Sequence, residues 1–244
     1  MLVGIYAYTV QIYVDFSGYT DMARGLAMLL GFDLPINFDR PYAATSIQDF
    51  WSRWHVSLSR WLRDFLFRPL VLAGRRGRVA SARNLLLVML VAGLWHGAAW
   101  TFVAWGGIHG LGLVWGRLAR GRRRRLGRPR PAVSGWRVAG RRVVTFHVVA
   151  LAWVVFRADS MTRAGEVFRQ LAVWGPAEAV RPLLVAVIVA VVAAQYLQPR
   201  FEVRVRLAFA RVGPAVQAAC LALALLVTDA LGPAGVPPFI YFRF

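Results

Sequence analysis

Four histidines are the side chains best suited to catalysis in this chain: His55, His96, His109 and His147. His96 stands in the apolar stretch Leu-Trp-His-Gly-Ala, about twelve residues into a segment that the sequence predicts to cross a membrane. A helix rises about 1.5 Å per residue, so this imidazole is expected roughly 18 Å deep, near mid-membrane. A neutral imidazole there suits a general base that takes the proton of a hydroxyl attacking an acyl carbonyl. A histidine that only hydrogen-bonds a neighbouring backbone carbonyl fits the same residues.

The other three histidines differ in their sequence neighbours. His55 stands in a segment rich in aromatic residues and arginines, with Arg53 and Ser57 close by. His109 and His147 lack polar neighbours and are interpreted as packing or cavity residues. Ionisable groups inside spans are costly, so each of the four is a candidate functional residue.

The sequence lacks the residue patterns that other kinds of functional site require. There is no His-Glu-x-x-His motif and no cluster of histidine, cysteine or carboxylate with metal-ligand spacing, so no metal site is predicted. The single cysteine, Cys220, has no partner for an intrachain disulfide. The glycines of GGIHGLG lie inside an apolar run without the strand that a phosphate-binding loop requires.

The elements that must position these residues are predicted from composition. Of the 244 residues 58% are hydrophobic and only 17% are charged, whereas about a quarter are charged in soluble domains. The mean hydropathy is +0.51. The charges come in blocks, separated by apolar stretches long enough to cross a hydrocarbon core, which takes about 20 helical residues. The sequence therefore predicts a membrane protein.

Charge sets the predicted topology. The net charge is +19, all 30 basic residues are arginines, and the arginine blocks alternate with apolar stretches, as the positive-inside rule requires. This alternation disfavours nucleic acid as the partner. Segments 60–83, 117–142 and 198–212 hold seven, eleven and four arginines and are assigned to the cytoplasm. Segment 157–182 is nearly neutral and is assigned to the outer side.

The N-terminal third is predicted to be irregular. Residues 1–14 are apolar and 15–21 are polar, which indicates either an interrupted helix or a chain that begins partway through one. Residues 46–67 are predicted to form one interfacial or re-entrant helix, because their aromatic and aliphatic residues recur every three or four positions. That stripe comprises Phe50, Trp54, Leu58, Trp61 and Phe65.

The remainder is predicted as spans and loops. Residues 84–118 are expected to form two spans, a hairpin broken at Gly106-Gly107. Segments 143–156, 183–197 and 214–231 supply further spans, with loops between them. Gly93 and Gly97 flank His96 and would let another helix approach closely. The predicted fold class is all-α: a polytopic transmembrane protein with interfacial or re-entrant helices around a buried funnel.

Several stretches resemble one family. The run YTVQIYVDFSGYTDMARGLAMLLGFDLPINFDRPYAATSIQDFWSRWHVSLSRWLRDFLFRPL is similar to the membrane-bound O-acyltransferases of bacterial envelopes, which include alginate O-acetyltransferase and the D-alanyl transferase of teichoic acid. LWHGAAWTFVAWGGIHG resembles the same family's Trp-His-Gly block, WVVFRADSMTRAGEVF its later Phe-Arg-Ala block, and FIYFRF its C-terminal ending. Family members are longer, with a bundle of spans before the first of these blocks.

The resemblance implies roles for particular residues. His96 would be the catalytic histidine, acting as base, and His55 the second active-site histidine, which polarises or orients. Asp15, Asn37 and Asp64 would be supporting residues. The donor would come from the cytoplasm and the acceptor hydroxyl from outside, meeting in a buried funnel. No cofactor is expected to be bound; an acyl donor such as acetyl-CoA or an acyl carrier protein would be the co-substrate.

The expected function is transfer of a small acyl group, acetyl, to hydroxyls of an envelope polysaccharide or glycan. The expected partners are membrane lipid, the acyl donor, and a glycan acceptor or partner acyltransferase outside. Residues 1–244 are expected to be a single multi-pass domain of the plasma membrane, the C-terminal part of the family's fold without its N-terminal spans. An inactive truncated remnant or a membrane scaffold subunit is the alternative. A transporter with a histidine proton relay is disfavoured, because the chain lacks paired repeats.

Overall fold

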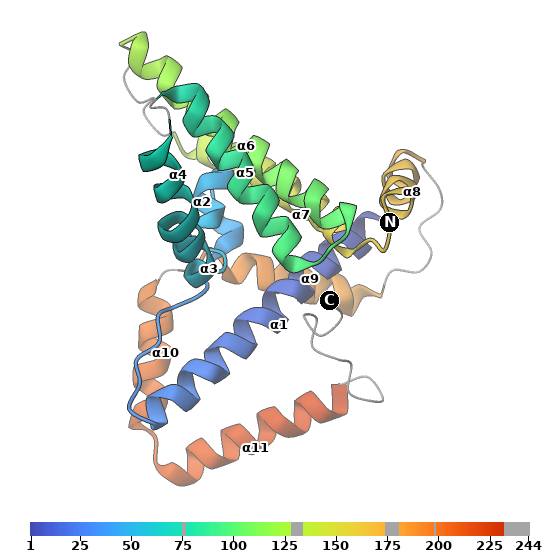
Figure 1. Cartoon of the computed structure of the whole chain (residues 1–244). Helices are drawn as coiled ribbons and strands as arrows, with labels where there is room; N and C mark the ends of the chain where they lie inside the picture. The colour runs from blue at the N-terminus through green and yellow to red at the C-terminus, as the bar shows by residue number, and fades with distance from the viewer. Residues whose placement is uncertain (75–76, 128–133, 174–180, 198, 232–244) are drawn as a thin grey trace. The chain divides into compact units, whose positions relative to one another are not determined.

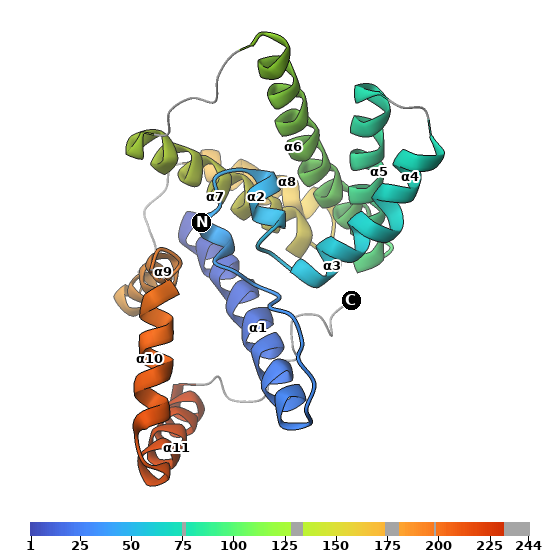
Figure 2. The ribbon, with the colours of Figure 1, turned by 90° about the vertical axis from the view of Figure 1, so that its left-hand side faces the viewer.

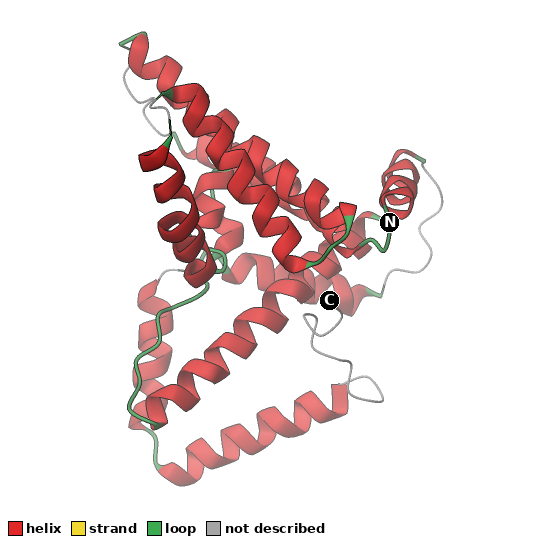
Figure 3. Cartoon of the chain, in the orientation of Figure 1, coloured by secondary structure: helices red, strands yellow, loops and turns green. Residues whose placement is uncertain are grey.

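The computed structural model describes residues 1–74, 77–127, 134–173, 181–197 and 199–231, and all regular elements in these ranges are helices (Figures 1 and 3). The predicted all-α class is confirmed for this part of the chain. Among the described residues two compact units are present, residues 1–195 and 196–231. The long helices of the first unit are α1 (Leu2–Leu29), α5 (Arg78–His96), α6 (Trp100–Arg125) and α7 (Gly135–Arg157). Its shorter elements are η1 (Pro41–Ala43), α2 (Ile47–Trp51), α3 (Val56–Trp61), η2 (Leu62–Phe67), α4 (Arg68–Ala73), α8 (Met161–Ala172) and α9 (Pro182–Ala194).

Helix α1 runs without a break through the polar residues 15–21, so the predicted interruption is wrong. The polar side chains do not break the helix, because the hydroxyls of Ser17 and Thr20 donate to carbonyls in the preceding turn of the same helix. Beyond the end of α1, Gly31 has a φ of +83°, the left-handed conformation that commonly follows a helix. One face of α1 is buried, with Ile5, Tyr8, Thr9, Ile12 and Phe16 at helical spacing.

The segment predicted as one helix over residues 46–67 is divided instead. Helix α2 begins after Ser46, whose hydroxyl accepts the Asp49 backbone N–H at 3.1 Å, and it ends at Trp51. His55 then takes a left-handed conformation, with φ 43° and ψ 56°, and α3 starts at the next residue. A left-handed residue cannot continue a right-handed helix, so the chain changes direction at this histidine.

The predicted apolar stripe is correspondingly lost beyond the break. Phe50 and Trp54 are buried, but Trp61 is 50% exposed and Phe65 66% exposed. Residues 62–67 form a π-helical turn just ahead of Pro69. Proline has no backbone N–H, so the regular hydrogen-bond ladder cannot be kept at this position, and a π turn accommodates the gap.

Helices α5 and α6 form the predicted hairpin; they pack closely near the turn and diverge toward their other ends (Figure 2). The turn lies at residues 97–99 and not at Gly106-Gly107, which is a correction to the prediction. A Cβ on Gly106 would come within 3.1 Å of the Met89 carbonyl carbon, so this glycine serves close helix packing. A Cβ on Gly93 would meet the Phe102 carbonyl in the same way. Because the turn comes earlier, His96 is the last residue of α5 and does not lie in the middle of a span.

Two helices among the described residues have the length and apolar composition of a membrane span: Val79–His96 of α5 and the whole of α7. Helix α9 has the apolar composition predicted for a span but only 13 residues. Two segments predicted as loops contain helices, because their charged and apolar residues alternate at helical spacing. These are α8 within 157–182 and α10 (Pro199–Arg211) within 198–212.

The second unit contributes α10 and α11 (Pro214–Leu231). Helix α11 is the apolar segment predicted over 214–231, and its helical character is confirmed. Its first turn lacks acidic residues and its last turn lacks basic ones, although Asp229 lies near its C-terminal end. The free Cys220 lies exposed on this helix.

The core of the first unit is a cluster of aromatic rings from α6, α7 and the segment that follows α2. Trp54, which follows α2, lies 5.1 Å from Trp153 of α7, centroid to centroid. Trp153 stacks on Trp105 of α6 at 5.7 Å and meets Phe156 at 5.2 Å. Each of these four rings is at most 2% exposed. Aromatic pairs at these separations add to the stabilisation from buried area, so the cluster is a rigid base for its neighbours.

Candidate functional site

His96 is held by aromatic rings at the C-terminal end of α5. Its side chain is 7% exposed. The imidazole meets Trp105 and Phe156 edge-on, each at 5.2 Å, and lies tilted toward Phe102 at 6.4 Å. Gly97 follows at once, and a Cβ there would clash with the Phe102 ring. The end of α5 and the start of α6 are thus shaped around this one imidazole.

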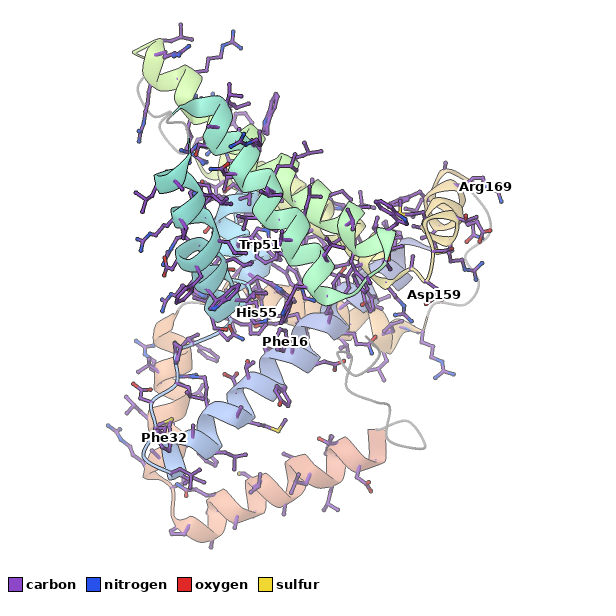
Figure 4. All side chains as sticks on the ribbon, viewed as in Figure 1. Phe16, Phe32, Trp51, His55, Asp159 and Arg169 are labelled. Atoms are coloured by element: carbon purple, nitrogen blue, oxygen red, sulfur yellow. The ribbon has the colours of Figure 1, made fainter. Side chains whose placement is uncertain are left out.

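His55 is fixed by its own backbone turn. Its Nδ1 accepts the backbone N–H of Leu58 at 3.4 Å, which makes it the N-cap of α3. A nitrogen that accepts from an amide carries no proton, so the neutral ring has its hydrogen on Nε2. The ring meets Phe16 of α1 edge-on at 4.8 Å (Figure 4). Burial lowers the pKa of His55 to about 4, so the ring is neutral at physiological pH.

The two histidines come from different elements, yet they lie within electrostatic range of each other. Ring contacts also connect both histidines to the aromatic core: His55 meets Phe16, Phe16 meets Phe38 and Phe38 meets Trp54, while Phe156 touches His96. Trp153 connects Trp54 with Phe156: its ring centroid lies 5.1 Å from that of Trp54 and 5.2 Å from that of Phe156. The fold therefore brings together the two residues that the sequence singled out for chemistry.

Asn37 is tied to the turn that carries His55. Its side-chain Oδ1 accepts the Ser57 backbone N–H at 3.1 Å and the Ser57 hydroxyl at 2.9 Å. Its backbone carbonyl accepts the Val56 N–H at 3.0 Å. The Ser57 hydroxyl oxygen is also 3.3 Å from Nδ1 of His55. Asn37 therefore holds in place both residues that follow the histidine.

The two predicted acidic supports are placed differently. Asp15 is half-buried on α1 next to Phe16, and the described part of the chain gives it no hydrogen bond or ion pair. Asp64 lies in η2, where it accepts from Arg63 at 2.9 Å and pairs with Arg68 at 3.1 Å. The hydrogen bond from Arg63 is the main reason why the pKa of Asp64 is lowered. The structure thus joins Asn37 to His55 and leaves Asp64 with arginines.

The remaining histidines have polar partners that their sequence neighbours do not indicate. His109 is fully buried; its Nδ1 accepts the indole N–H of Trp51 at 3.2 Å. His147 hydrogen-bonds the Val143 carbonyl through Nδ1 at 2.8 Å, so its Nε2 accepts the Tyr6 hydroxyl at 2.7 Å. In both cases the partner lies on an element distant in sequence, and only the fold reveals the pair.

Sequence reasoning did not single out the aromatic residues that surround the pair. Phe16, Trp105, Trp153 and Phe156 come from three helices, and aromatic residues are common throughout the chain, so no local pattern marks them. The described residues contain no group of three or more histidine, cysteine or acidic side chains arranged to hold a metal ion. The chemistry that this site offers is that of two neutral imidazoles in a largely apolar setting: proton transfer and hydrogen-bond donation to a developing negative charge.

Comparison with known proteins gives a family match. The model of the membrane-bound O-acyltransferase family matches residues 1–151, more than half of the chain. This range includes α1, the His55 turn, the α5–α6 hairpin and the first part of α7.

Curated relatives match a similar fraction of this chain. A peptidoglycan O-acetyltransferase of Helicobacter pylori is 43% identical over 164 residues, 67% of this chain and 30% of that protein. A probable alginate O-acetylase of Azotobacter vinelandii is 44% identical over 173 residues, 70% of this chain and 32% of that protein. A teichoic acid D-alanyltransferase of Streptococcus thermophilus is 36% identical over 166 residues, 62% of this chain and 40% of that protein. The chain spans about a third of the length of these relatives.

Proposed function

The chain belongs to the membrane-bound O-acyltransferase family, and we propose that it transfers a small acyl group, acetyl, from a thioester donor to hydroxyls of an envelope glycan. The single observation that carries this proposal is that His55 and His96, from different elements, are connected by ring contacts through the aromatic core and lie close enough to influence each other electrostatically. The names of the relatives support the reaction class, because all three describe acyl transfer to an envelope polymer.

The roles of the two imidazoles follow from their surroundings. His96 acts as the general base: it takes the proton of the acceptor hydroxyl while that oxygen attacks the acyl carbonyl carbon. Nε2–H of His55 donates a hydrogen bond to the carbonyl oxygen as it becomes an oxyanion. The carbon–sulfur bond then breaks, and the departing thiolate takes the proton from His96. An ester and a thiol are formed, and no covalent enzyme intermediate is needed.

The neutral state of His55 suits the donor role. Its Nδ1 is occupied by the Leu58 N–H, so Nε2 carries the only ring proton and is the one available donor. Asn37 keeps this arrangement in place through Ser57 and Val56. We therefore assign Asn37 as a positioning residue. Asp15, one residue from Phe16, is assigned a weaker supporting role, and Asp64 one that acts through the arginines it pairs with.

The proposal also assigns the arginine-rich segments and the two substrates to sides of the membrane. Arginine-rich segments 60–83 and 117–142 are placed on the cytoplasmic side of the plasma membrane, where the acyl donor arrives. The donor is a thioester such as acetyl-CoA or an acyl carrier protein. The glycan acceptor, or a partner acyltransferase, approaches from outside, and both substrates reach the histidine pair through a buried funnel in a multi-pass protein. The family membership and the two membrane-length helices support this arrangement.

The test is the acetyl content of envelope glycans in cells whose only copy of the gene carries His96→Ala. We expect acetylation to fall at least a hundredfold, the usual scale of a lost acid–base catalyst. His147→Gln is the matched control, because it removes a histidine that bonds Tyr6 and lies outside the pair. Unchanged acetylation with a correctly inserted His96→Ala protein would overturn the proposal and favour a membrane scaffold.

A further inference from the structure

A pocket of about 250 Å³ lies between η2 and the α5–α6 hairpin, with α2 and α3 at its border. Its walls are largely apolar, and Leu62, Phe67, Val88 and Leu113 are among them. None of the four histidines lines it. The pocket is therefore distinct from the histidine pair.

Three arginines border this apolar space: Arg63 from η2, and Arg117 and Arg120 from the last turns of α6. Arg63 is paired with Asp64 at 2.9 Å. For Arg117 and Arg120, no carboxylate among the described residues lies within ion-pair distance. Burial, and next the charges of Arg117 and Arg124, lower the pKa of Arg120. Arg117 and Arg120 thus border the cavity without a carboxylate of the described residues to balance their charges.

The neutral polar groups at the pocket suit the same kind of ligand. Gln48 and Ser59 line it and supply an amide and a hydroxyl. Guanidinium groups match the geometry of phosphate oxygens and bind them through two parallel hydrogen bonds. Apolar walls with a few converging polar groups are typical of sites for small amphiphilic ligands.

We propose that this pocket binds a phosphate ester that carries a long uncharged chain. Arg117 and Arg120 hold the phosphate oxygens, Gln48 and Ser59 complete the hydrogen bonding, and the apolar walls cover the chain. Two sources supply this chemistry: an anionic phospholipid of the membrane, and the phosphopantetheine arm of an acyl donor.

The second source would connect the pocket to the histidine pair, and that part of the inference rests on the proposed function. Residues 85–89 of α5 line the pocket and His96 ends the same helix, so roughly 10–17 Å of helix separates them. Trp51 lines the pocket and also meets Trp105 at 5.8 Å, while Trp105 touches His96. A thioester on an extended arm would span such a distance from its phosphate.

The experiment measures binding to the purified full chain in phosphatidylcholine nanodiscs. One arm compares S-acetyl phosphopantetheine with S-acetyl pantetheine, which lacks the phosphate. The other compares nanodiscs with and without phosphatidic acid, read as the shift in thermal unfolding. In at least one arm, we expect the phosphate-bearing ligand to bind at least tenfold more tightly, or to raise the unfolding midpoint. The responding arm identifies the source.

Arg117→Gln with Arg120→Gln is expected to weaken that binding at least tenfold. Arg122→Gln with Arg125→Gln removes the same charge from the same helix end but not from the pocket, and is expected to change binding less than twofold. Equal effects of the two double variants, or no phosphate preference in either arm, would overturn the inference. His96→Ala is expected to keep phosphate binding, so a failure of the acyl-transfer proposal is distinguishable from a failure of this one.

Discussion

At the scale of single residues, the conformation of His55 links its position to its protonation. The left-handed turn directs Nδ1 to the Leu58 N–H, and packing against Phe16 removes the ring from water. A left-handed residue other than glycine is uncommon and is often found at functional sites. Here it fixes the tautomer, so that Nε2 is the donor that the proposed reaction needs.

The pH dependence of acyl transfer tests this. The pKa of His55 is lowered to about 4, below the usual value of 6.5, so the ring remains neutral until the pH falls through about 4. The stability that its neutral form contributes is fully present above pH 6.5 and declines as the pH falls toward 4. Initial rates in membrane vesicles should therefore show no loss near pH 6.5 that depends on His55. A loss near pH 6.5 in the natural protein that is absent from His55→Gln would contradict the assignment.

The sequence identified His55 and His96 as candidates because of their residue types and blocks, but it did not show how they are held. The Asn37–Ser57 bonds and the Trp51–His109 bond join residues far apart in the chain, and no spacing rule detects such pairs. The predicted position of His96 along its helix was wrong for a related reason. It was counted from a span whose true beginning and end depend on where the hairpin turns.

At the scale of elements, glycine decides how the α5–α6 hairpin packs. The hairpin was correctly predicted from the sequence, but its turn was predicted at Gly106-Gly107. Glycine ends or bends a helix in one context and admits a neighbouring helix in another, and a single sequence does not separate these uses. In the structure, Gly106 faces the backbone of Met89 and Gly93.

The pair of neighbouring glycines offers a matched test. A Cβ at Gly106 would lie 3.1 Å from the Met89 carbonyl carbon and 3.4 Å from Cα of Gly93, so Gly106→Ala forces the helices apart. We expect it to cost about 1–3 kcal/mol, as overpacking does. A Cβ at Gly107 meets only Leu90, at 3.7 Å, so Gly107→Ala is expected to be neutral or to stabilise by up to about 1 kcal/mol. Thermal unfolding of the purified variants measures both, and equal effects would show that Gly106 is not a packing position.

The divided segment before α5 shows why local periodicity was insufficient. The three-to-four spacing of its aromatic residues is real, but a stripe identifies a helix only while the backbone stays right-handed. The left-handed His55 divides it, and the π turn over residues 62–67, ahead of Pro69, disturbs the helical spacing of its last part. Proline was visible in the sequence, whereas a left-handed histidine has no sequence signature.

At the scale of the whole molecule, the distribution of arginine sets the predicted topology. Long apolar helices and blocks of arginine were the strongest signals in the chain, and two membrane-length helices match them. The helices within 157–182 and 198–212 were missed because charge counting treats any charged stretch as a loop. An amphipathic helix also has this composition.

Cysteine labelling tests the topology. In a Cys220→Ala background, Asp159→Cys lies just before α8, where it is exposed, and Arg122→Cys lies exposed near the end of α6. A maleimide that does not cross membranes should label position 159 (Figure 4) in intact cells. Position 122 should react only after the cells are permeabilised. Labelling of position 122 in intact cells would reverse the assignment of sides.

The most direct test of the central claim is a double-mutant cycle on the rate of acyl transfer in isolated membranes, with His55→Ala, His96→Ala and the double variant. The account predicts that each single change lowers the rate at least a hundredfold. It also predicts that the double variant is no slower than the more severe single one, because both side chains act on the same acyl group. Independent, multiplying losses, or an unaltered rate for His96→Ala, would contradict the account.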